Sequence, residues 1–136
     1  MAWPFDSEEQ LDEWADNYVL AHQTTPYTTD AHEAAHLASE PGYSALLLGH
    51  AETLWRFVLK VLERQPSEWA LGMLAAGPIE DLISGCGTQF IDRIETQARQ
   101  DPLFREALHG VWQNTTPNAL WARIKRARGP ASSSSC

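Results

Sequence analysis

A chain of 136 residues in which 43% are hydrophobic and 21% are charged can bury its own core, so one globular domain is expected. The formal net charge of −8 disfavours binding to nucleic acid or to an anionic membrane, and no apolar run approaches the length of a membrane span. Two cysteines, and an N-terminus without a basic and apolar leader, favour a reducing, cytoplasmic location.

The first part of the chain has the apolar spacing of helices. We predict a first helix over residues 7–23, with Asp6 or Ser7 as its N-cap, and a short second helix over residues 30–39. A third helix is predicted over residues 46–64, where apolar side chains recur at helical spacing.

Proline and glycine punctuate the rest of the chain. Proline just inside a start and glycine just past an end are typical of helices, so Gly77 and Gly85 are expected to end two short ones. The N-caps expected for four helices are Ser67, Thr88, Asp101 and Thr116. The predicted helices cover residues 68–76, 78–84, 89–99, 102–109 and 117–128.

Short helices joined by short turns must pack against their neighbours in the sequence. The pattern therefore predicts an all-α fold of about seven short helices, arranged as stacked α-hairpins in a compact bundle or a short solenoid-like array. One helical domain is expected over residues 1–128, and the serine-rich segment 129–136 is typical of a flexible tail.

Four segments of the second half form a recognisable pattern. They are GPIEDLI at 77–83, FIDRIE at 90–95, AR-x-DP-x-FR at 98–105 and GVW at 110–112. With these segments the chain resembles a bacterial family of small all-helical proteins that is catalogued only as a domain of unknown function. The resemblance implies a bacterial origin and a helical domain, and it implies no activity. The chain departs from the family at Cys86, where a histidine before glycine is more usual.

Residues of this pattern also have structural roles open to them. If Gly77 is an N-cap, Glu80 stands at the third helical position, where it faces unpaired N–H groups and the positive end of the helix dipole. Capping and packing are therefore favoured over a chemical site. Surface ion pairs are expected for Asp92 with Arg93 and for Glu95 with Arg99.

The predicted first helix carries a cluster of acidic residues on its polar side: Glu8, Glu9, Asp12, Glu13 and Asp16. Like charges four residues apart destabilise a helix unless a basic partner, or distant lysines and arginines of the chain, neutralise them. A solvated face in an acidic protein is the structural alternative. Our leading hypothesis is a non-catalytic binding module that docks on a basic protein partner, for example as an immunity or antitoxin-like protein.

The segment His32-Glu33-Ala-Ala-His36 supports a different hypothesis, a zinc-dependent hydrolase. Two imidazoles four residues apart on a helix can bind one zinc ion, and the glutamate between them can activate its water. The predicted helix is short, however, and Gly42 stands where a third histidine would be needed. Glu33 also lies three residues after Asp30, where a capping role competes. We therefore expect no catalytic residue, no metal and no cofactor.

The C-terminal tail supports a third hypothesis. Cys136 follows four serines and is open to oxidation or to a modifying enzyme, which would make the chain a scaffold or a substrate. Cys86, between two glycines, could act as a nucleophile only beside a histidine that the sequence does not place there. The sequence leaves the oligomeric state open.

Overall fold

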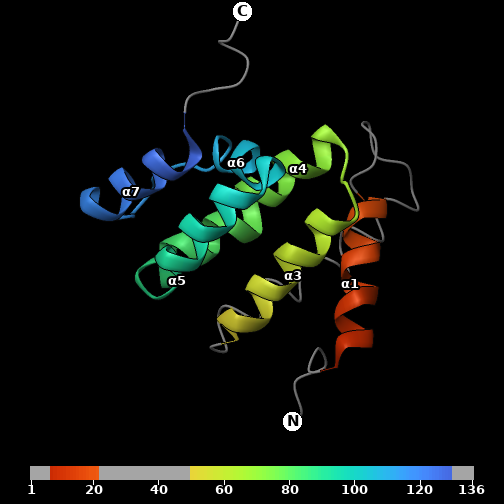
Figure 1. Cartoon of the computed structure of the whole chain (residues 1–136). Helices are drawn as coiled ribbons and strands as arrows, with labels where there is room; N and C mark the ends of the chain where they lie inside the picture. The colour runs from red at the N-terminus through yellow and green to blue at the C-terminus, as the bar shows by residue number, and fades with distance from the viewer. Residues whose placement is uncertain (1–6, 22–49, 130–136) are drawn as a thin grey trace, which may run out of the picture. The chain divides into compact units, whose positions relative to one another are not determined.

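The computed structural model describes residues 7–21 and 50–129, and every regular element in these ranges is helical. The predicted all-α class is therefore confirmed (Figure 1). The described residues form five helical segments, so the prediction of about seven is wrong for this part of the chain. Four of them are single helices: α1 (Glu8–Ala21), α3 (Ala51–Glu63), α6 (Pro102–Leu108) and α7 (Asn118–Arg128). The fifth is a continuous run of three elements, which are α4 (Glu68–Leu74), the π-helix η1 (Ala75–Ile79) and α5 (Glu80–Gln100).

The chain divides into two compact units, residues 1–73 and residues 74–136. The boundary falls inside the helical run that begins with α4. Each unit is described below by itself. Among the described helices, none has both the length and the apolar character needed to cross a membrane.

The first unit is built around an aromatic cluster between α1 and α3. The ring of Trp14 stacks on that of Phe57 with 3.8 Å between centroids and 15° between planes. Tyr18 meets the same ring edge-on, with centroids 5.3 Å apart. All three side chains are buried, together with Leu11 at the start of the same α1 stripe. The predicted N-cap Ser7 is confirmed, because its hydroxyl accepts a hydrogen bond from the backbone N–H of Gln10.

In the second unit, the predicted helix end at Gly77 is wrong. Gly77 does not adopt the left-handed conformation of a helix-ending glycine, and the helix continues through it as a π-helical turn. The wide turn contains Pro78, which has no N–H to donate. The backbone N–H of Glu80 reaches back five residues to the carbonyl of Ala75. The chain therefore accommodates this proline by widening one turn instead of ending the helix.

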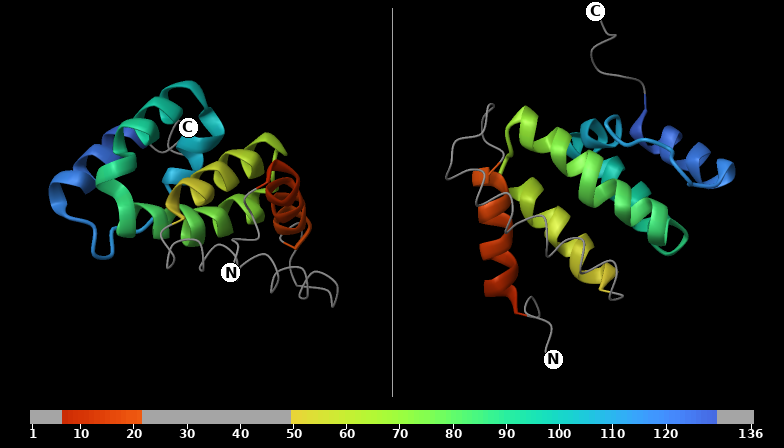
Figure 2. Two further views of the ribbon diagram at one scale, coloured as in Figure 1. Left: turned by 90° about the horizontal axis from the view of Figure 1, so that it is seen from below. Right: turned by 180° about the vertical axis from the view of Figure 1, so that it is seen from behind.

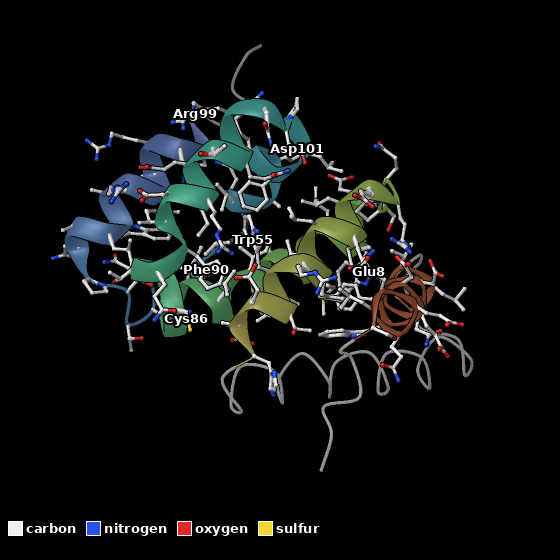
Figure 3. The ribbon with its side chains drawn as sticks, turned by 60° about the horizontal axis from the view of Figure 1, so that its bottom comes forward. Glu8, Trp55, Cys86, Phe90, Arg99 and Asp101 are labelled. Atoms are coloured by element: carbon white, nitrogen blue, oxygen red, sulfur yellow. The ribbon has the colours of Figure 1, made fainter. Side chains whose placement is uncertain are left out.

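The second predicted break, after Gly85, is present as an interruption within α5. Cys86 has non-helical dihedral angles, φ −137° and ψ 21°, and the ribbon bends there (Figure 3). Gly87 follows and is buried against α7. A Cβ atom at Gly87 would lie 2.6 Å from Cδ2 of Leu120, so a side chain here would force the end of the Leu120 side chain to move.

The ends of α6 and α7 show one confirmed cap and one error. Asp101 caps α6 as predicted, since its carboxylate accepts a hydrogen bond from the N–H of Leu103 at 3.0 Å. Thr116 does not cap α7. The N-cap is Pro117, and the Thr116 hydroxyl is buried without a hydrogen-bond partner among the described residues. Gln113 holds this turn instead, because its amide nitrogen donates to the Thr116 carbonyl at 3.1 Å.

Candidate binding surfaces

The acidic cluster of α1 is split by its contacts with α3. Glu8, Asp12 and Asp16, one helical turn apart, form ion pairs with the three cations of α3 and its C-terminal flank. These pairs join Glu8 to Arg56 and Lys60, Asp12 to Lys60 and Arg64, and Asp16 to Arg64.

Each carboxylate in this series has a partner 48 positions further along the chain. The register therefore shows that α1 and α3 run in the same direction, as two views of the ribbon also show (Figures 1 and 2). We call these three acids and three cations the ion-pair ladder. The Lys60 nitrogen lies 2.8 Å from the Asp12 carboxylate, and the Arg64 Nε lies 2.6 Å from that of Asp16.

The ladder changes the electrostatics of Asp12 in particular. Hydrogen bonds from Lys60, and then from Arg64, lower the pKa of Asp12 because they stabilise its ionised form. Carboxylates four residues apart on α1 would otherwise repel one another. The ladder therefore neutralises Glu8, Asp12 and Asp16 with cations of the same chain, which is one of the alternatives that the sequence left open.

Glu9 and Glu13 have no ion pair within the described part of the chain and lie on the exposed side of α1. At 100° per residue they share this face with Leu20, whose side chain is 54% exposed. We call Glu9, Glu13 and Leu20 the outer face of α1. The acidic cluster was identified from the sequence, but Leu20 was not. The sequence indicates the exposure of Leu20 in one way, because Leu20 falls outside the apolar stripe of Leu11, Trp14 and Tyr18.

The charge balance of the first unit also bears on the contrast between the paired acids of the ladder and the unpaired Glu9 and Glu13. Residues 1–73 contain only three lysines and arginines, and all of them are engaged in the ladder. The described part of the unit carries eight carboxylates against these three cations, which is a net charge of −5. The internal pairs therefore leave an excess of negative charge that no lysine or arginine of the unit can neutralise.

A second surface lies in the second unit, at Trp112. Its side chain is 74% exposed, which is unusual for a tryptophan, whereas Val111 beside it is buried. The backbone N–H of Trp112 donates to a carboxylate oxygen of Glu80 at 2.9 Å. The predicted role of Glu80 near a helix start is therefore wrong, because no helix starts at Pro78 and the carboxylate holds a distant loop instead.

Other contacts bring the same two chain segments together. A Cβ atom at Gly110 would lie 3.1 Å from the Cβ of Ala75, in the π-helical turn. Asp81, next to Glu80, is partly buried, and burial followed by the negative charge of Glu80 raises its pKa. We call Glu80, Asp81 and Trp112 the Trp112 site. The sequence analysis did not predict that Trp112 is exposed. The signal that could have shown it is that a tryptophan between a helix end and a turn has no helical face on which to be buried.

The acids of the FIDRIE segment form ion pairs with α7 instead of within their own helix. Arg123 lies 3.0 Å from Asp92 and 2.7 Å from Glu95, so the predicted local pairs are replaced by links between α5 and α7. The hydrogen bond from Arg123 is the main cause of a lowered pKa of Glu95. These acids serve to dock α7 on α5.

A family model described as a family of unknown function, DUF6869, matches residues 25–131. The chain belongs to this family. The search of curated proteins found no match, and the search of solved structures found none either. The DUF6869 match covers the Trp112 site and α3, whereas α1 precedes it.

Several predicted site residues of this DUF6869 protein lie outside the described residues. They are His32, Glu33 and His36 of the zinc hypothesis and Cys136 of the tail. Within residues 7–21 and 50–129, no three His, Cys, Asp or Glu side chains are grouped so that they could hold a metal ion. Cys86 is half-buried and is not in a disulfide.

Proposed function

We propose that this protein is a non-catalytic binding module that docks on a protein partner with a basic surface, through the outer face of α1. The observation that carries the proposal is the negative charge of Glu9 and Glu13, which form no ion pair within the described residues. Every lysine and arginine of the first unit is already paired within the ladder, yet Glu9 and Glu13 remain exposed. An excess charge of this kind attracts a basic partner over a distance and speeds its encounter.

The ladder supports the proposal in a second way. Because Glu8, Asp12 and Asp16 are tied to α3, the helix that displays Glu9 and Glu13 is held in place against the aromatic cluster. A rigid charged face loses little conformational entropy on binding. Leu20 adds an apolar contact on the same face, which would slow dissociation once charge has steered the encounter.

Immunity or antitoxin-like binding is the biological role that we propose for such a face. A protein of this kind covers a basic surface of its partner, and complementary charge gives it both speed and selectivity. The partner would be another protein, since excess carboxylates repel nucleic acid and anionic membranes.

The experiment is capture of the partner by the full-length chain from a lysate of its source organism, followed by association kinetics with the purified partner. In the double variant Glu9→Gln/Glu13→Gln, the association rate should fall by roughly three- to tenfold at low salt, and its salt dependence should weaken. Leu20→Ser should mainly raise the dissociation rate. The matched control is Glu63→Gln/Glu68→Gln, which removes the same charge from exposed positions outside α1 and should have a much smaller effect.

Three results would contradict the proposal. One is a captured partner whose association is indifferent to salt, and another is a control variant that slows association as much as the α1 variant. The third is stoichiometric zinc in the purified protein that is lost in His36→Ala, because it would establish a metal centre in place of a binding face.

A further inference from the structure

The second unit displays Trp112 on a loop that is fixed on both sides. Before it, Val111 is buried, and the Val111 N–H donates to the carbonyl of Leu108 at 3.3 Å. After it, the Gln113 amide donates to the carboxamide oxygen of Asn118 at 2.8 Å. The backbone N–H of Trp112 itself donates to the Glu80 carboxylate. The exposure of the indole is therefore a property of an anchored loop and not of a loose one.

The Glu80 side chain that anchors this loop brings negative charge to the same place. One of its oxygens accepts the Trp112 N–H, and the carboxylate forms no ion pair with any cation in the described ranges. Asp81 is the next residue, and the negative charge of Glu80 acts on it directly. A carboxylate that holds the backbone of an exposed tryptophan, with a second acid next to it in the sequence, would be stabilised by a cation from outside the chain.

We infer that the Trp112 site binds an arginine side chain presented by a protein partner, with the guanidinium stacked on the exposed indole and hydrogen-bonded to the Glu80–Asp81 pair. A guanidinium fits because it is planar, stacks on aromatic faces and presents two parallel N–H groups to a carboxylate. A lysine ammonium is a point charge with a tightly held hydration shell, so it gains less from the ring. A phosphate ligand is disfavoured by the two carboxylates.

This inference concerns the second unit alone and does not rest on the outer face of α1. It gives the region covered by the DUF6869 match a binding role of its own, because both Glu80 and Trp112 lie inside that match. The segments GPIEDLI and GVW, which are separate in the sequence, contribute the carboxylates and the ring to one site.

The test is an NMR titration of the full-length, ¹⁵N-labelled chain with a capped Gly-Gly-Arg-Gly-Gly peptide and with its Lys counterpart. The indole N–H signal of Trp112 is assigned from its loss in Trp112→Leu. We expect this signal to shift saturably with the Arg peptide, and the Lys peptide to bind roughly two- to fivefold more weakly. Asp81→Asn should weaken the binding of the Arg peptide by a similar factor.

Glu80→Gln separates charge from anchoring, because the side-chain amide keeps an oxygen that can accept the backbone N–H of Trp112 while the negative charge is lost. It should weaken Arg-peptide binding while the amide signals of the loop stay where they are. Glu9→Gln/Glu13→Gln is the control and should leave the titration unchanged. The inference is overturned if the Trp112 indole does not respond, if both peptides bind equally, or if the α1 control weakens binding as much as Asp81→Asn.

Discussion

Phe57→Ala is the substitution that most directly tests how the first unit is held together. Phe57 is fully buried in α3, and its ring receives Trp14 face-on and Tyr18 edge-on from α1. Removing the ring therefore takes away the surface on which α1 packs, and it leaves a cavity next to two large aromatic side chains. The ladder on the flank of the interface would remain.

The size of the effect follows from this burial. Truncating a buried phenylalanine to alanine costs about 3–5 kcal/mol, and a ring with two aromatic neighbours belongs in the middle of that range or above it. We therefore expect a loss of about 4 kcal/mol, against a total of roughly 5–15 kcal/mol for a whole domain. Phe57→Leu keeps most of the apolar volume but loses both ring contacts, so it should cost roughly 1–2 kcal/mol.

Amide hydrogen exchange under native conditions is the suitable assay, because it reports on α1 and α3 separately from the second unit. A loss of about 4 kcal/mol corresponds to roughly a thousandfold faster exchange of the protected α1 and α3 amides. Leu20→Ala is the matched control, since it truncates an apolar side chain of α1 that is 54% exposed and should change exchange little. The reasoning is refuted if Phe57→Ala leaves the α1 amides protected, or if Leu20→Ala costs as much.

Two further predictions concern polar contacts. Asp101→Ala removes the acceptor for the Leu103 N–H and should cost about 1 kcal/mol in urea unfolding, whereas Asp101→Ser keeps an acceptor and should recover most of it. Equal losses in both variants would rule out capping as the cause. Because hydrogen bonds from Lys60 and Arg64 lower the pKa of Asp12, its stabilising contribution is present above its unfolded pKa and is lost as the pH falls through the lower folded value. In Lys60→Met the Asp12 pKa, followed by carboxyl NMR, should rise towards its ordinary value, and an unchanged pKa would contradict the ladder.

Local sequence determined the helical class and several helix ends. Ser7, Ser67 and Asp101 were predicted as N-caps, and each accepts a hydrogen bond from a backbone N–H two or three residues ahead. Such contacts depend only on residue type and close spacing, so the sequence is sufficient for them. Thr116 shows where this reasoning stops, because its hydroxyl is buried by the surrounding unit instead of turning to the helix end.

The two proposed binding surfaces depend on contacts between distant segments, which local spacing in the sequence cannot specify. The direction and register of α3, whose residues lie 48 positions further along the chain, decide which acids of α1 are neutralised. As a result Asp12 is paired and Glu13 is not, although the two are adjacent in the sequence. Likewise, Glu80 has its partner at Trp112, 32 residues further along the chain, because the tertiary fold brings the two segments together. The sequence alone determined the helical class, several N-caps and the excess of acid. Only the tertiary structure decided which charges are paired inside the protein and which side chains are left for a partner, because that choice is made by contacts between distant segments.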